Sequence, residues 1–237
     1  MAINLSRKLD RLKEAALDAV FPDFCAGCGL EGELLCVECR GSVRVDLQAE
    51  KCPFCERVTS SGATCRKCAN ASSLDGCLAL AHYAEPAVKG IIKKWKYQFA
   101  LEAEHQVAAW VRASNLENIL PNLPWGVVPV SLHVERERWR GFDQAKRLAH
   151  LIAHELGLQY SESIKRHQKT VPQAALGDRR RQRGELQNAF ISATDPPPYV
   201  LLVDDVLTTG ATLDAAAQAL KDAGSESVWG LVLARGN

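Results

Sequence analysis

Short apolar runs alternate with amphipathic stretches over most of this 237-residue chain. Four almost wholly apolar runs, typical of strands covered on both faces of a parallel sheet, lie at 76–83, 125–132, 199–203 and 227–234. Apolar positions at helical spacing predict helices at 86–99, 101–113, 144–156 and 213–223. This alternation predicts an α/β domain at 76–237 with an open, mostly parallel sheet, and a site at the carboxyl ends of its strands.

The first 22 residues place Leu5, Leu9 and Leu12 near helical spacing, with charged residues between them. An amphipathic N-terminal helix packed on the domain is the preferred interpretation for 1–22. Membrane contact is the weaker alternative, because the polar face carries charges of both signs.

Residues 23–75 form a cysteine-rich segment with four Cys-x-x-Cys pairs. The pairs are Cys25/Cys28, Cys36/Cys39, Cys52/Cys55 and Cys65/Cys68. Two such knuckles complete a tetrahedral thiolate site, so the segment predicts a double zinc-ribbon module with two structural zinc ions. Disulfides are the alternative. Sequential pairing of the knuckles needs the shortest loops, and a crossed arrangement remains open.

The strand predicted at 199–203 is followed by two carboxylates, Asp204 and Asp205, and then by the small-residue loop 208–212 and a helix. Small residues let backbone N–H groups converge on an anion, and the helix adds the positive end of its dipole. Ionised carboxylates accept hydrogen bonds from vicinal ribose hydroxyls. The order therefore favours a ligand that carries both phosphate and ribose. An acidic strand end with a threonine N-cap is the alternative.

Composition is that of an ordinary globular protein, with 24% charged residues and a formal net charge of +1. No run approaches the ~20 apolar residues that span a bilayer, and the N-terminus lacks a signal peptide, so we expect a cytoplasmic protein. Residues 133–183 hold 12 Lys and Arg against 6 Asp and Glu. This basic stretch suits a polyanionic ligand or nucleic acid, and charge alone does not separate the two.

The run VLLVDDVLTTGAT at 200–212 resembles the phosphoribosyl-pyrophosphate (PRPP) loop of type I phosphoribosyltransferases. With the cysteine module, nearly the whole chain resembles the ComF family of competence-associated, phosphoribosyltransferase-like proteins. The resemblance implies transfer of a phosphoribosyl group from PRPP, with magnesium, to a nucleobase or amine. It gives Asp204 and Asp205 the catalytic, ribose-binding role. It places the 5′-phosphate on Thr208, Thr209, Gly210, Ala211 and Thr212.

The resemblance also assigns a pyrophosphate loop after the strand at 125–132. Its expected residues are Val130, Ser131, Arg138 and Arg140, with Lys96 facing the same site. The family pattern Arg-Gly-Phe-Asn-Gln appears here as RGFDQ, so Asp143 keeps a helix N-cap but adds a negative charge near a polyanion. A lid over the site is expected to carry Arg179, Arg181 and Arg183. A plain amphipathic, arginine-rich helix is the alternative for 135–140, and a solvated charged surface is the alternative for the later run.

Two functions stay open: a phosphoribosyltransferase with an unknown acceptor, and a non-catalytic competence factor that senses PRPP or handles single-stranded DNA beside the DNA-uptake machinery. A third reading is a zinc-ribbon nucleic-acid binder with a vestigial α/β domain. It is disfavoured because residues 21–80 hold 6 Lys and Arg against 8 Asp and Glu.

Overall fold

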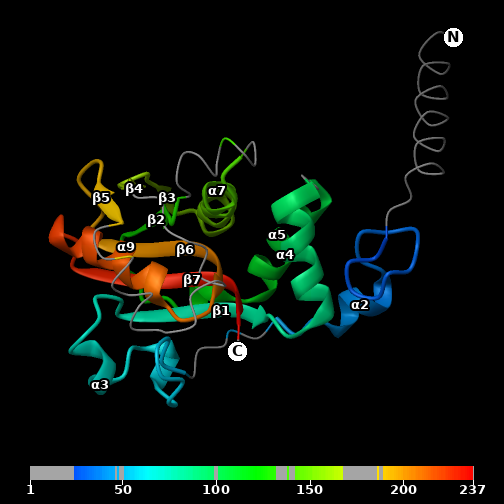
Figure 1. Ribbon diagram of the computed structural model, residues 1–237, viewed down its shortest axis with the longest axis horizontal. Coiled ribbons are helices and arrows are strands. Elements are labelled where there is room, and N and C mark those ends of the chain that lie inside the picture. The colour runs from blue at the N-terminus through cyan, green and yellow to red at the C-terminus, as the bar shows by residue number, and fades with distance from the viewer. Residues whose placement is uncertain are drawn as a thin grey trace, which may run out of the picture.

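A five-stranded parallel sheet forms the centre of the molecule (Figure 1). The computed structural model describes residues 24–45, 47, 51–98, 101–131, 138, 142–167, 186 and 189–236. The strands are β1 (Gly76–His82), β2 (Trp125–Pro129), β3 (Gln159–Tyr160), β6 (Tyr199–Leu207) and β7 (Ser227–Arg235), in the order β1-β7-β6-β2-β3. The parallel α/β class is therefore confirmed. The chain leaves β2 and β6 in opposite directions along the sheet, so the crevice between these strands is the switch point where ligands of such sheets bind.

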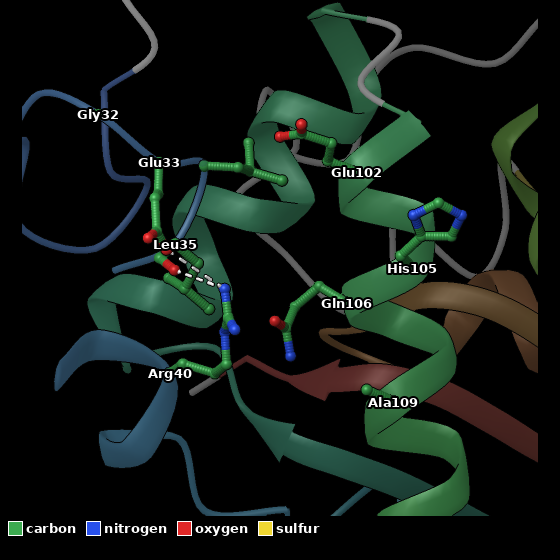
Figure 2. Close-up of a pocket in the computed structure, with 9 residues that line it drawn as sticks. Gly32, Glu33, Leu35, Arg40, Glu102, His105, Gln106 and Ala109 are labelled. Atoms are coloured by element: carbon green, nitrogen blue, oxygen red, sulfur yellow. Dashed lines mark hydrogen bonds and ion pairs between the residues drawn. The ribbon is translucent and has the colours of Figure 1, made fainter. Parts of the chain in front are cut away.

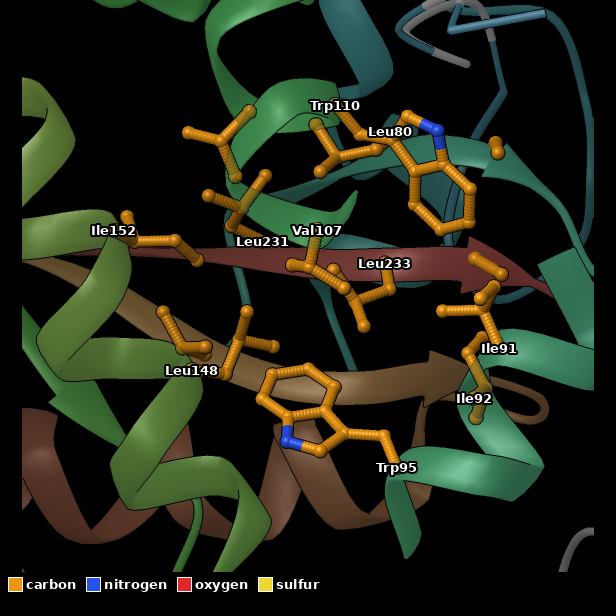
Figure 3. Packing of buried hydrophobic residues seen from close by; sticks show 14 of the residues in the cluster. Leu80, Ile91, Ile92, Trp95, Val107, Trp110, Leu148, Ile152, Leu231 and Leu233 are labelled. Atoms are coloured by element: carbon orange, nitrogen blue, oxygen red, sulfur yellow. The ribbon is translucent and has the colours of Figure 1, made fainter. Parts of the chain in front are cut away.

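Three helices cover one face of the sheet: α4 (Pro86–Gln98), α5 (Leu101–Ala113) and α7 (Gln144–Leu156). Trp95 of α4, Trp110 of α5 and Leu148 of α7 pack with Leu80 and Leu231 of the sheet, all nearly inaccessible to solvent (Figure 3). Asp143 and Gly157 bound α7 as the sequence predicts, with the Asp143 carboxylate accepting from two backbone N–H groups and Gly157 at φ 63°.

The opposite face is covered by helix α9 (Ala211–Asp222), by the hairpin of β4 (Ile164–Arg166) and β5 (Phe190–Ser192), and by part of the cysteine-rich segment. Successive side chains of a strand point to opposite faces of the sheet, so β1 contributes to both cores. Leu78 and Leu80 pack in the first core, and Cys77 and Ala79 pack in the second. Cys77, the one cysteine outside the paired motifs, is thus fully buried in the sheet.

Two sequence expectations differ from the structure. Strand β6 does not stop at residue 203 but runs to Leu207, because β7 continues to pair with it through Arg235. The sequence also predicts no strand between 161 and 192, yet Ile164–Arg166 and Phe190–Ser192 pair as the antiparallel β4–β5 hairpin. The four predicted helices, α4, α5, α7 and α9, begin and end within about two residues of the predicted bounds.

The cysteine-rich segment forms two separate compact units, each with four of the paired cysteines and short helices. The first contains α2 (Val37–Ser42) and lies beside α4. The second contains η1 (Ser60–Gly62) and α3 (Arg66–Ala69) and lies beneath β1 in Figure 1. A last short helix, η2 (Leu116–Asn118), follows α5. Among the described residues, no helix has the length and apolar character to cross a bilayer. The predicted helix at 1–22 lies outside these residues.

Candidate phosphate-binding site and metal centres

Two carboxylates stand at the switch point of the sheet. Strand β2 ends at Pro129, opposite Val203, so β6 carries Asp204 and Asp205 past the end of its neighbour. The Asp205 N–H donates to Asp204 Oδ1 at 2.8 Å. Lys96, from the last turn of α4, places Nζ 2.5 Å from Asp205 Oδ2, with both side chains less than a quarter exposed. Lys96, which the resemblance assigns to the pyrophosphate, thus lies against the acid pair.

Asp204 has an unusual protonation equilibrium. Burial raises its pKa to about 7, and the neighbouring charge of Asp205 acts in the same direction. The Asp205 N–H and the Lys96 ammonium oppose this rise, and Asp143 adds to it. A carboxyl group that is half ionised near neutrality is typical of sites where protonation is coupled to ligand binding.

The loop after β6 turns directly into α9. Gly210 caps the helix with φ 76°, a left-handed conformation that only glycine adopts without strain. The Asp214 N–H closes the first turn onto the Gly210 carbonyl at 2.9 Å, and the Ala211 N–H faces the Thr209 hydroxyl at 3.4 Å. A small hollow lined by Asp204, Val206, Leu207, Thr208, Gly210, Thr212 and Leu213 opens at this helix N-terminus. An anion there would meet backbone N–H groups and the helix dipole.

The N-terminus of α7 borders the same site. Asp143 is 3% exposed, and its Oδ1 accepts from the N–H groups of Ala145 at 2.9 Å and Lys146 at 3.2 Å. Gln144 donates from Nε2 to the Lys96 carbonyl at 3.2 Å and so ties α7 to the end of α4. Asp143 keeps the predicted cap, and its carboxylate also acts to raise the pKa of Asp204.

The predicted pyrophosphate residues are only partly brought together. Val130 and Ser131 follow β2, and the Val130 N–H donates to the Val203 carbonyl at 2.8 Å. The Ser131 hydroxyl is buried and has no hydrogen-bond partner in the described part of the chain. Arg138 is exposed, whereas Arg140, Arg179, Arg181 and Arg183 lie outside the described residues.

The eight cysteines of the paired motifs gather as two clusters of four, each with all its sulfur atoms within 4.8 Å of one another. Residues 25–39 supply one cluster and residues 52–68 the other, so the knuckles pair sequentially and not crosswise. The Cys28–Cys36 and Cys55–Cys65 sulfur separations are 3.8 and 3.6 Å. Four sulfurs at 2.3 Å from a zinc ion stand about 3.8 Å apart at the edges of a tetrahedron, so both clusters fit zinc.

Each cluster also has the backbone support of a thiolate site. The Cys36 N–H faces Cys25 Sγ, and the Cys65 N–H faces Cys52 Sγ, both at 3.4 Å. The Cys68 backbone N–H, followed by hydrogen bonds from the neighbouring cysteine side chains, lowers the pKa of Cys65 to about 6. Burial and the neighbouring Cys65 sulfur raise the pKa of Cys68 to about 12. Four neighbouring thiols cannot all ionise on their own, because the thiolates would repel one another. A bound dication would offset this repulsion.

The two clusters dock on different parts of the domain. The first lies on α4, where a Cβ at Gly90 would come within 1.9 Å of the Ala26 carbonyl oxygen and Lys94 donates to the Phe24 carbonyl. The second lies on the sheet and α9, where Arg235, only 7% exposed, donates to the Lys51 carbonyl at 3.1 Å. Sequence reasoning missed Arg235, because an arginine ending a strand has no local signal of burial.

A second hollow, of about 490 Å³, separates the first cluster from α5 (Figure 2). Arg40 and Glu33 line one side and form an ion pair at 3.5 Å, while Glu102, His105 and Gln106 of α5 line the other. It shares no lining residue with the hollow at Gly210.

The chain is similar in sequence to known proteins over most of its length. Residues 140–237 match the model of the phosphoribosyl transferase domain. The chain is 30% identical over 224 residues to Competence protein F of Haemophilus influenzae, covering 84% of this chain and 96% of that protein. It is 26% identical to Competence protein ComFC of Bacillus subtilis over 81% of this chain and 80% of the relative. It is 29% identical to DNA utilization protein YhgH of Escherichia coli over 82% and 87% of the two chains.

Proposed function

The chain belongs to the ComF family, and we propose that its phosphoribosyltransferase-like domain binds PRPP and transfers the phosphoribosyl group with release of pyrophosphate. One observation carries this proposal: an acid pair, a basic side chain and a glycine-capped helix N-terminus meet at the switch point of one parallel sheet. Carboxylates suit the ribose diol, the helix N-terminus suits the 5′-phosphate, and Lys96 suits pyrophosphate oxygens.

Each group then has a task set by its position. The Gly210 turn and the first N–H groups of α9 hold the 5′-phosphate, and Thr208, Thr209 and Thr212 offer hydroxyl donors. Asp204 and Asp205 orient the ribose and favour positive charge as the C1′–oxygen bond breaks, which is an oxocarbenium-like step. Magnesium brought with PRPP would neutralise pyrophosphate oxygens.

Lys96 would stabilise the leaving pyrophosphate together with the Ser131 hydroxyl. Both groups border the crevice, and Lys96 is held by Asp205 while the Ser131 oxygen has no partner in the described chain. The departing charge would therefore meet one cation and one hydrogen-bond donor already placed before the reaction, which reduces the reorganisation that the transition state requires.

Calorimetric titration with PRPP and magnesium tests the proposal. The wild type should bind, and the double variant Asp204→Asn/Asp205→Asn should lose the heat of binding. A matched control, Asp195→Asn/Asp222→Asn, removes two exposed carboxylates elsewhere and should bind as the wild type does. Absence of binding by a zinc-loaded, folded wild type would refute the proposal.

A non-catalytic role with single-stranded DNA is the second candidate, favoured by the basic stretch at 133–183 and by the DNA-related names of the relatives. Pyrophosphate release with one defined nucleobase or amine would support the enzyme. Salt-sensitive retention of single-stranded DNA that depends on Arg179, Arg181 and Arg183, without pyrophosphate release, would support the DNA role.

A further inference from the structure

The second metal cluster directly adjoins the proposed phosphate loop. Phe54, between the two cysteines of the Cys52/Cys55 knuckle, is 7% exposed. A Cβ added at Gly210 would lie 2.9 Å from Phe54 Cε1 and 3.1 Å from Cδ1. The Pro53 carbonyl oxygen would lie at 3.5 Å from the same point. The knuckle therefore covers the glycine on which the loop turns.

Polar contacts hold this knuckle in place from both sides of the loop. Arg235 of β7, paired in register with Leu207 of β6, donates to the carbonyls of Lys51 at 3.1 Å and Cys52 at 3.4 Å. Its strand thus links the knuckle to the residue that begins the loop.

On the far side, the chain that leaves the second cluster is bonded to α9. Asp214, in the first turn of the helix, accepts from the Ser73 N–H at 2.8 Å and the Leu74 N–H at 3.3 Å. Lys221, near the helix end, pairs with Asp75 at 2.6 Å. The knuckle, the loop and its helix are therefore one packed unit, and Cys52, Phe54 and Leu74 share the second core with Ala211 and Leu213.

We propose that Phe54 is a positioning residue for the phosphate loop, held against Gly210 by the metal at Cys52, Cys55, Cys65 and Cys68. Glycine can adopt more backbone conformations than any other residue type. The loop at Gly210 therefore needs packing contacts from outside to hold it in one conformation. A preformed cradle binds more tightly, because less conformational entropy is lost when the ligand arrives. The proposal rests on the proposed function and assigns the second ribbon a part in phosphate binding.

The test compares two Phe→Ala variants in full-length, zinc-loaded protein. Phe54→Ala should raise the Kd for PRPP with magnesium about 10-fold or more, keep two zinc ions per chain, and speed amide hydrogen exchange at 207–213. Phe24→Ala is the matched control: Phe24 adjoins the first cluster, and its side chain is 49% exposed. It should leave the Kd and the loop exchange unchanged. Phe54→Leu, which retains apolar bulk, should recover most of the affinity.

A second variant tests the metal itself. Cys55→Ser removes the exposed ligand of the second cluster and should lower the zinc content and weaken PRPP binding together. Zinc loss with unchanged affinity would overturn the link between metal and loop.

The outcomes separate this proposal from the proposed function. If the wild type binds PRPP and Phe54→Ala binds equally well with unchanged loop exchange, the positioning role fails and the function stands. If the wild type does not bind PRPP, the function fails, and exchange at 207–213 still decides whether Phe54 orders the loop. Unchanged exchange would then overturn the positioning role as well.

Discussion

Alanine in place of Gly210 tests the contact between the second cysteine cluster and the proposed phosphate loop. The residue has φ 76°, and holding a non-glycine residue there costs about 1–2 kcal/mol. The new methyl group would also stand 2.9 Å from the Phe54 ring, and such overpacking costs about 1–3 kcal/mol. The sum predicts a loss of about 2–5 kcal/mol in the free energy of unfolding for Gly210→Ala.

The two contributions separate in a double-mutant cycle with Phe54→Ala. In the Phe54→Ala background the methyl group has no ring to meet, so Gly210→Ala should cost only the backbone strain of about 1–2 kcal/mol. The coupling free energy should therefore be about −1 to −3 kcal/mol, well outside the additivity expected of independent sites.

Urea unfolding with saturating zinc, followed by tryptophan fluorescence, measures all four corners of the cycle. Equal m-values across the variants would show that the midpoints report stability alone. Additive effects, within about 0.5 kcal/mol, would refute the reasoning, because they would show that the ring does not confine Gly210.

Three further predictions follow from the site. Gly90→Ala should detach the first cluster from α4 and lower the urea midpoint, because its Cβ would stand 1.9 Å from the Ala26 carbonyl oxygen; an unchanged midpoint would contradict the packing. Lys96→Met removes a charge that lowers the pKa of Asp204, so a carboxyl ¹³C NMR titration should show that pKa higher in the variant than in the wild type. The pKa of Asp204 is raised from the ordinary aspartate value of 3.8 to about 7 in the folded protein. The folded state therefore binds the extra proton between these pH values, and the free energy of unfolding should fall as pH rises from about 4 to about 7. The slope should reach at most about 1.4 kcal/mol per pH unit and should be absent from Asp204→Asn, and identical slopes in both proteins would contradict it.

Much of the candidate site is readable from the sequence because its parts are contiguous. The apolar run of β6, the carboxylates Asp204 and Asp205, and the Gly210 turn follow one another within a dozen residues, so local rules suffice. Helix bounds follow from similarly local signals, such as the Asp143 cap of α7. The pairing of knuckles also favours the nearest partner, since shorter loops close at lower entropic cost.

What the sequence does not reveal depends on contacts between distant segments. The extension of β6 to Leu207 carries acidic residues through a strand, which only pairing with β7 explains. The β4–β5 hairpin is too short for any period to show, with Ile164 and Phe190 as its buried residues. Phe54 lies against Gly210 although more than 150 residues separate them in the chain. No sequence pattern near either residue predicts this contact.

The order of strands in the sheet also bears on how the protein is made. Strand β7 is synthesised after the other four strands of the sheet, yet it lies between β1 and β6 and joins β1 to the sheet. Both cysteine clusters are synthesised before the sheet, but the second cannot form its contacts with Arg235 until β7 has been made. A chain lacking β7 would have a second cysteine cluster without its contacts to Arg235, and its β1 would be separated from β6. Such a species exposes strand edges that chaperones and proteases recognise.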